Sequence, residues 1–441
     1  MLQPSLKRSL GLASLAAVMY FNVSGGAFST EGLVASIGPG MALLILVLVP
    51  IFWSIPETLL VAELASMLPE EGGYYRWVHR AFGPFWAFQN GWCTWCYSLV
   101  DMAIYPVLFN QYLAFFFPSL GGHAQWAISL AMIWSATAIN LRGAGRVGHV
   151  SMFAASFVIL TFLAITLAAV PHMTHVPWQP FVRGDAAPTG ALGVGLSIAL
   201  WNYIGWDNAS TVGEEIRDAP RTYPRALAIT LVVVTAGYLL PLSATLAATD
   251  WTTWKTGGWP AITLASTGAA GPLLSRCVAL AGVVSAVALF NALLMAYSRI
   301  PLAMARDGLL PAALSVLDRN GNPRRAVLLA AVFYSVFTLL PFAQLVVADV
   351  LLYSFALALE FGALLMLRTK EPQLRGSFRV PVGLAGLWVL AALPMLLLLF
   401  AIWLSVRDGE LGAPAVVGAF AAAAVGPVLW QLTSRARRRV A

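Results

Sequence analysis

Long, uninterrupted apolar runs are the feature of this sequence that most constrains its fold. Of its 441 residues, 59% are hydrophobic and only 10% are charged, whereas a soluble domain carries about 25% charged residues. In lipid, backbone polar groups must be satisfied internally, so membrane-spanning structures are helices or closed barrels. The runs lack the alternation of barrel strands. We therefore expect an all-α polytopic membrane protein.

Twelve segments are long enough for a helix to cross a bilayer core, which needs about 20 apolar residues. They are expected near residues 10–37, 40–67, 83–117, 124–141, 147–171, 190–216, 224–248, 272–303, 325–342, 345–367, 384–406 and 412–433. No soluble domain fits between these segments. We interpret residues 1–441 as a single transmembrane domain.

The distribution of basic residues predicts the orientation of these spans. With the N-terminus inside, all but four of the 26 Lys and Arg residues fall on the cytoplasmic side; the exceptions are Arg183, Lys255, Arg276 and Arg407. Such a bias is typical of cytoplasmic loops. We therefore expect a multi-pass protein of a cell membrane (inner or plasma) with both termini cytoplasmic. The bias also explains the net charge of +7 without a nucleic-acid partner.

Polar residues and glycines interrupt two spans that lie five spans apart. In the first span they are Asn22, Ser24, Gly25, Gly26 and Ala27. In the sixth they are Trp201, Asn202, Gly205, Trp206 and Asp207. Such residues also serve close helix packing, but interruptions at corresponding places in two halves are typical of a transporter's binding site. We predict that the two interruptions line one cavity and bind the substrate.

Three carboxyl groups are predicted at membrane depth, namely Glu57, Asp101 and Asp207. Ionisable residues there are costly and usually functional. Desolvation favours a protonated carboxyl and a bound amine favours the charged form, so these three are candidates for proton coupling. Three other acids lie nearer the span ends and are expected to pair with cytoplasmic arginines: Glu63, Glu214 and Glu215.

Aromatic residues near the interruptions are further candidates for substrate contact. Trp201 and Trp206 flank the sixth-span interruption, and Tyr97 lies in the third span. An aromatic ring attracts an ammonium group placed over its face. Tryptophans also serve as interfacial anchors, which is the alternative for these positions.

The sequence gives little support for an enzyme. Cys93 and Cys96 form a C-x-x-C inside the third span and fit ordinary helix positions. The G-x-G-x-x-G at 143–148 follows no strand and is interpreted as a cytoplasmic turn. We find no metal-ligand cluster or nucleophile array at membrane depth. We therefore expect no catalytic residues, no cofactor and no metal.

Three segments resemble the amino acid–polyamine–organocation superfamily. They are residues 200–210 (LWNYIGWDNAS), residues 214–226 with the pattern E-x-x-x-P-x-x-x-P-x-A, and residues 62–74. The resemblance extends over most of residues 10–370. It implies two inverted five-helix repeats (LeuT-like), 1–171 and 190–368, with helices 1 and 6 broken. Two peripheral helices within 384–433 would follow.

The resemblance also implies roles for individual residues. Trp201 matches the aromatic gate of the arginine/agmatine antiporter branch, and Asp207 matches its proton-sensing acidic position. The first interruption departs from the family's usual G-S-G-x-F, because Ser24-Gly25-Gly26-Ala27-Phe28 stands there. The fifth span lacks the lysine that replaces sodium in some members.

Within the superfamily, the chain resembles polyamine uptake transporters through residues 21–26, 55–57 and 101–108. A polyamine has several ammonium groups and no carboxylate, so two acids such as Asp101 and Asp207 suit it. We expect a secondary active transporter that moves polyamines or amino acids by alternating access, in symport with protons. The alternative is an exchanger or permease for neutral or cationic amino acids. Sodium or a counter-substrate as the driving species, and the oligomeric state, are left open.

Overall fold

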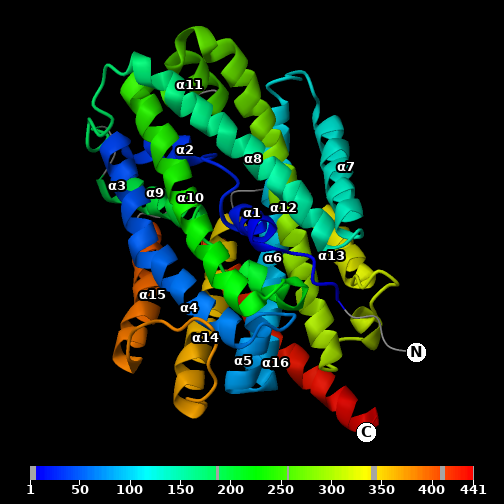
Figure 1. The fold of residues 1–441 in the computed structure, drawn as a ribbon. Helices are drawn as coiled ribbons and strands as arrows, with labels where there is room; N and C mark the ends of the chain where they lie inside the picture. Colours follow the sequence, from blue (N-terminus) through cyan, green and yellow to red (C-terminus); the bar gives the residue numbers. More distant parts are fainter. Residues whose placement is uncertain (1–5, 185–187, 256–257, 339–344, 408–412, 441) are drawn as a thin grey trace.

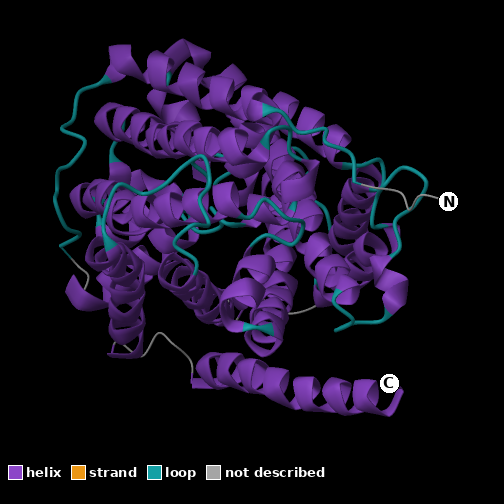
Figure 2. Ribbon diagram, turned by 60° about the horizontal axis from the view of Figure 1, so that its bottom comes forward, coloured by secondary structure: helices purple, strands orange, loops and turns teal. Residues whose placement is uncertain are grey.

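The computed structural model describes residues 6–184, 188–255, 258–338, 345–407 and 413–440. These residues are helical apart from loops (Figure 2). Within them the β-structure is limited to two isolated bridges, between Leu10 and Ile216 and between Glu71 and Val212. The structure therefore agrees with the prediction of an all-helical protein.

The α-helices are labelled in Figure 1 in chain order. They are α1 (Leu12–Val23), α2 (Thr30–Ile37), α3 (Pro39–Val49), α4 (Ile55–Met67), α5 (Tyr74–Phe82), α6 (Pro84–Leu113), α7 (Gly122–Asn140), α8 (Ala144–Ala169), α9 (Pro188–Trp201), α10 (Ala219–Ala248), α11 (Gly258–Ser266), α12 (Gly271–Arg306), α13 (Arg324–Phe337), α14 (Leu345–Lys370), α15 (Leu384–Arg407) and α16 (Ala413–Val440). A π-helix, Pro50–Ser54, joins α3 to α4, so this stretch remains helical throughout.

Six helical stretches within the described residues are long and apolar enough to cross a membrane. They are Pro39–Met67, Ala144–His172, Ala219–Ala248, Gly268–Arg306, Leu351–Lys370 and Leu384–Leu404. Leu12–Val23 and Phe420–Leu432 are shorter apolar helices. The other predicted spans also contain helices, among them α6 and α7, which are shorter or more polar. The chain is thus a helical membrane protein with several spans.

The first predicted span is interrupted, because α1 ends at Val23 and α2 begins only at Thr30. The sixth predicted span departs more strongly from expectation. After α9 ends at Trp201, the chain forms only two short 3-10 turns, Asn208–Thr211 and Gly213–Glu215. Side chains here bond to their own backbone, as when Thr211 Oγ1 donates to the Asn208 carbonyl (2.8 Å). Such bonds compete with a regular helix.

The interrupted segments lie inside the bundle. α1 packs against α8, α10 and α12 and lies near the centre of the molecule (Figure 1). α12 packs also against α6 and α11, and α14 packs against α5 and α6. The backbone groups released at the two interruptions are therefore surrounded by protein, not by lipid.

Buried or partly buried arginines pair with the three acids expected to be paired. Glu215 Oε1 lies 2.7 Å from Arg299 Nη2, and both side chains are almost fully buried. The other two pairs are Glu63 with Arg368 (2.6 Å) and Glu214 with Arg306 (3.6 Å). The predicted pairing of these three acids with arginines is confirmed, and the cytoplasmic side of the pairs stays a prediction. Arg299 Nε also lies 3.4 Å from Glu71 Oε1.

The N-terminal segment is attached beside the Arg299 cluster, which consists of Arg299, Glu215 and Glu71. The Ser9 and Leu10 amides both donate to the Glu215 carbonyl, at 2.9 and 3.0 Å. The Arg217 amide donates back to the Leu10 carbonyl at 2.8 Å. The chain before α1 is therefore fixed to the chain that follows the second interruption.

We predict that Arg299→Ala lowers the stability of the protein by about 3–5 kcal/mol, because it removes the buried cation beside the Glu215 and Glu71 carboxylates. Thermal unfolding in detergent, monitored by intrinsic fluorescence, measures the loss. Arg306→Ala is the matched control, because its pair with Glu214 is partly exposed and is worth at most about 1 kcal/mol. Equal destabilisation by the two substitutions would contradict the prediction.

Candidate functional site

A cavity lies where the two interruptions meet. It contains about 600 Å³ of space that no atom fills, including the part open to solvent. Its wall is formed by Asn22, Val23, Ser24, Phe28, Ser29, Tyr97, Asp101, Tyr105, Leu108, Trp201, Asn202, Ile204, Gly205, Asn208, Leu289, Tyr297 and Tyr353. Residues more than 300 positions apart in the sequence thus share one wall.

The two interruptions approach each other closely at Gly205. Its φ of +97° lies in a region that residues with a side chain rarely adopt. A Cβ atom at this position would lie 2.4 Å from the Asn22 carbonyl oxygen. The Gly205 amide donates to the Tyr353 hydroxyl at 3.1 Å. Only glycine lets the two segments and α14 meet at this point.

A second contact joins the interruptions on the cavity wall. The Asn202 amide nitrogen lies 2.9 Å from Ser29 Oγ, and its oxygen lies 3.1 Å from the same hydroxyl. Ser29 has a positive φ of 74° and precedes α2. The predicted site residue Asn202 therefore holds the first interruption in place as well as facing the cavity.

Backbone carbonyls released at the first interruption are bonded to neighbouring side chains. The Gly25 carbonyl accepts from Ser285 Oγ at 2.6 Å, and the Ala27 carbonyl accepts from Trp259 Nε1 at 2.7 Å. Gly25, Gly26 and Ala27 were predicted to contact substrate, but they lie outside the set of wall residues. In this structure the Gly25 and Ala27 carbonyls bond to side chains of α12 and α11.

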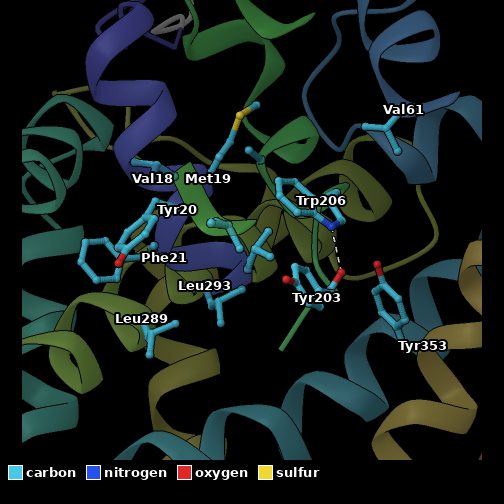
Figure 3. Packing of buried hydrophobic residues seen from close by; sticks show 14 of the residues in the cluster. Val18, Met19, Tyr20, Phe21, Val61, Tyr203, Trp206, Leu289, Leu293 and Tyr353 are labelled. Carbon is cyan, nitrogen blue, oxygen red and sulfur yellow. Dashed lines mark hydrogen bonds between the residues drawn. The ribbon is translucent and has the colours of Figure 1, made fainter. Parts of the chain in front are cut away.

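The second interruption is stabilised in the same way. Trp206 Nε1 donates to the Tyr203 carbonyl at 2.8 Å, as Figure 3 shows, and the Tyr238 hydroxyl donates to the Asn202 carbonyl at 2.7 Å. Trp206 is 1% exposed and lies outside the set of wall residues. Trp201, in contrast, is on the wall.

Asp101 supplies the one carboxyl group on the wall among the described residues. Its Oδ1 accepts from the Tyr105 hydroxyl at 2.7 Å, and its Oδ2 accepts from the Tyr297 hydroxyl at 2.9 Å. No ion pair within the described residues involves it. Each carboxylate oxygen keeps acceptor capacity beyond these bonds. The arrangement suits a cationic ligand.

The other two predicted carboxyl groups, Glu57 and Asp207, lie just behind the wall. The Tyr353 hydroxyl is 2.8 Å from Glu57 Oε1 and 3.0 Å from Asp207 Oδ1. Glu57 and Asp207 are at most 1% exposed. Figure 3 shows the Tyr353 hydroxyl pointing toward the segment of Tyr203 and Trp206. Tyr353 therefore connects both acids to the cavity.

Three polar side chains on the wall have buried atoms without a hydrogen-bond partner in the described part of the chain. They are both amide atoms of Asn22, Oδ1 of Asn208 and the hydroxyl of Tyr97. Buried polar atoms in folded proteins are nearly always bonded. Unbonded donors and acceptors around a cavity are what a polar ligand requires.

Sequence reasoning missed Tyr297 and Tyr353 as site residues. Both lie on the wall and bond to predicted acids. In the sequence, each appears only as a tyrosine within an apolar run. Buried tyrosines are common in helical bundles, so this pattern does not identify a site residue. Only packing of α12 and α14 against α6 reveals which of the 12 tyrosines face the cavity.

Most of the chain is similar in sequence to known proteins. Residues 10–427 match the family model described as "Amino acid permease". A polyamine transporter of Oryza sativa subsp. japonica is 34% identical over 386 residues, which are 87% of this chain and 71% of that protein. A polyamine transporter of Arabidopsis thaliana is 32% identical over 89% of this chain and 79% of its own. A branched-chain amino acid permease of Bacillus subtilis (strain 168) is 26% identical over 91% and 88%.

We predict that Gly205→Ala destabilises the protein more than Gly83→Ala. Both glycines have positive φ, 97° and 85°, but a Cβ at position 83 meets no atom within 4 Å. Backbone strain of about 1–3 kcal/mol is therefore common to both variants. The collision with the Asn22 carbonyl adds about 1–3 kcal/mol at position 205. Thermal unfolding of the purified variants measures the difference; equal losses would refute the proposed close approach.

Proposed function

The chain belongs to the amino acid permease family of the amino acid–polyamine–organocation superfamily, and from that membership we propose that it is a proton-coupled secondary transporter of polyamines or amino acids. It is a membrane transporter and not an enzyme. The observation that carries the substrate assignment is Asp101, an acid on the cavity wall bonded only to hydroxyl donors among the described residues. A cation in the cavity is the partner that this carboxylate lacks.

We propose the LeuT-like architecture for its spans. The first repeat comprises residues 1–171, the second comprises residues 190–368, and the two peripheral helices lie within 384–433. Interruptions in the first and sixth of twelve spans would then meet at the centre of the two repeats. The orientation that we propose places both termini in the cytoplasm of a cell membrane, as the distribution of basic residues favours.

Polyamines are favoured over amino acids by the state of the first interruption. An amino acid needs free backbone amides to bind its carboxylate. The Ser24 and Gly25 amides both donate to the Tyr20 carbonyl, at 2.9 and 3.1 Å. The Gly26 amide donates to Ser24 Oγ at 3.1 Å. Three successive amides therefore already have hydrogen-bond acceptors within the protein. A polyamine has no carboxylate and does not need these amides.

The Tyr353 contacts support proton coupling. A phenol has one hydrogen to donate, yet the Tyr353 hydroxyl lies within hydrogen-bonding distance of carboxyl oxygens of both Glu57 and Asp207. Both contacts are hydrogen bonds only if one of the two carboxyl groups carries a proton. We propose that this proton and the charge of Asp101 respond to substrate binding, and that Glu57, Asp101 and Asp207 couple proton movement to transport.

Alternating access requires the cavity to open to each side in turn. The Arg299 cluster ties α12 to the chain after the second interruption and to the segment between α4 and α5. We propose that this cluster separates whenever the cavity opens toward the cytoplasm.

The second candidate function is exchange or uptake of neutral or cationic amino acids, which the likeness to a branched-chain amino acid permease favours.

Asp101→Asn tests the substrate class. The substitution keeps the shape of the side chain and removes its charge, and an ammonium group that loses a desolvated partner loses about 2–5 kcal/mol, or roughly 30-fold or more in affinity. We expect the variant to lose binding of putrescine and spermidine by this factor. Competition against a labelled substrate in proteoliposomes, with putrescine, spermidine, arginine and alanine as competitors, measures it.

One outcome of this experiment would argue against polyamines. Competition by alanine alone in the wild type, unaffected by Asp101→Asn, would support the amino acid permease instead. Glu371→Gln serves as the control. Glu371 pairs with Arg80 at the protein surface and is outside the set of wall residues, so its loss should leave competition unchanged.

Trp201→Ala should weaken amine binding by about 2- to 30-fold, because an ammonium–aromatic contact is worth about 0.5–2 kcal/mol. Trp201→Phe keeps an aromatic face and should have a smaller effect. Trp388→Ala is the control, since that ring is 60% exposed on the outside of the bundle. Ligand-induced thermal stabilisation gives the affinities. Unchanged affinity in Trp201→Ala would remove this residue from the site.

A further inference from the structure

One buried carboxyl group takes no part in the site described so far. Glu360 lies in α14, is 0% exposed, and is outside the set of wall residues. Neither of its carboxyl oxygens has a hydrogen-bond partner among the described residues. Buried charges are normally paired because an unpaired ion in an apolar interior is very costly. A carboxyl group in this position therefore needs a reason.

Glu360 lies on the same helix as Tyr353, whose hydroxyl contacts the other two acids. Seven residues separate it from Tyr353, which is about two helical turns, so the two side chains project from similar faces of α14. Asp207 and Glu57 are its charged neighbours. Its polar neighbour is Asn90 of α6, whose side-chain nitrogen donates to the Ala356 carbonyl at 3.2 Å.

The helices packed around Glu360 supply no compensating cation in the described part of the chain. Glu57 comes from α4, Asp207 from the second interruption, Tyr74 from α5 and Tyr223 from α10. These neighbours are carboxylic acids or phenols. The group that would satisfy Glu360 in these surroundings is a proton, which turns one of its oxygens from an acceptor into a donor.

The positions of Tyr353, Glu360 and Arg368 along α14 indicate a path from the cavity to one end of the bundle. Tyr353, at the cavity wall, contacts Glu57 and Asp207. Glu360 follows two turns later, and Arg368, another two turns on, is paired with Glu63 near the end of both helices. Glu360 is thus the intermediate carboxyl group between the Tyr353 contacts and that end of the bundle.

We propose that Glu360 is a proton-relay residue, which takes the proton from Glu57 or Asp207 and releases it toward the end of the bundle that holds the Glu63–Arg368 pair. Glu360 first releases its own proton toward that end of the bundle and becomes a carboxylate. The O–H bond of the donor carboxyl then breaks, that group becomes a carboxylate, and a new O–H bond forms on Glu360. Because Glu360 has no hydrogen bond to either acid, a water molecule carries the proton between them. The proposal rests on the proton coupling proposed above.

The test separates proton-driven accumulation from exchange in proteoliposomes. Labelled spermidine is the probe, with labelled arginine as the second one, and a pH-sensitive dye inside the vesicles reports proton entry. We expect Glu360→Gln to lose roughly 10-fold or more of the accumulation driven by an inward proton gradient. Spermidine exchange at equal pH on both sides should persist, because the cavity wall is intact. Asp250→Asn, which removes an exposed acid just after α10, should behave as the wild type.

Each remaining outcome has a definite meaning. Accumulation and proton entry by Glu360→Gln at the wild-type rate would overturn the relay. Loss of exchange in both Glu360→Gln and Glu360→Asp would also overturn it, by showing a packing role. Restoration of accumulation by Glu360→Asp, which keeps a titratable group, supports it. Wild-type exchange without any gradient-driven accumulation would refute the proton coupling itself.

Discussion

Every peptide group that leaves a helix inside a membrane protein must find another partner, because hydrocarbon offers none. This requirement governs the centre of the structure. Two helices are interrupted there, and hydroxyl and indole groups from other helices bond to the freed carbonyls: Ser285 to Gly25 and Tyr238 to Asn202 are examples. The same hydrogen bonds hold the segments that form the cavity wall, so they both satisfy the backbone and set the shape of the binding site.

The buried acids fall into two groups according to their partners. Glu63 and Glu215 are bonded to Arg368 and Arg299, and these pairs tie separate elements together. Asp101 and Asp207 are bonded instead to tyrosine hydroxyls. An arginine fixes a carboxylate in its charged form, whereas a phenol supports a carboxyl group in either form. The first group therefore suits structure, and the second suits binding of cations and exchange of protons.

The candidate site was predictable from sequence in part. Interrupted spans identified Ser24, Trp201 and Asn202, which are on the cavity wall, and an acid at membrane depth identified Asp101. Gly25–Ala27 and Trp206, also predicted to contact substrate, are outside the set of wall residues, and a local motif does not reveal which side of a bent chain faces the cavity. It missed Tyr353 and Glu360 because a phenol or an acid in an apolar run gives no indication of its neighbours.

The sequence by itself determined that this chain is a helical membrane protein, since apolar runs of this length admit few other folds. It also determined where two helices are interrupted and which acids near the span ends find arginines. Tertiary structure decided the rest. Only packing brings Tyr353 between Glu57 and Asp207, which lie 296 and 146 residues away. Only packing places Gly205 against Asn22. Such contacts depend on how separate helices cross, and the periodicity of one helix carries no information about that crossing.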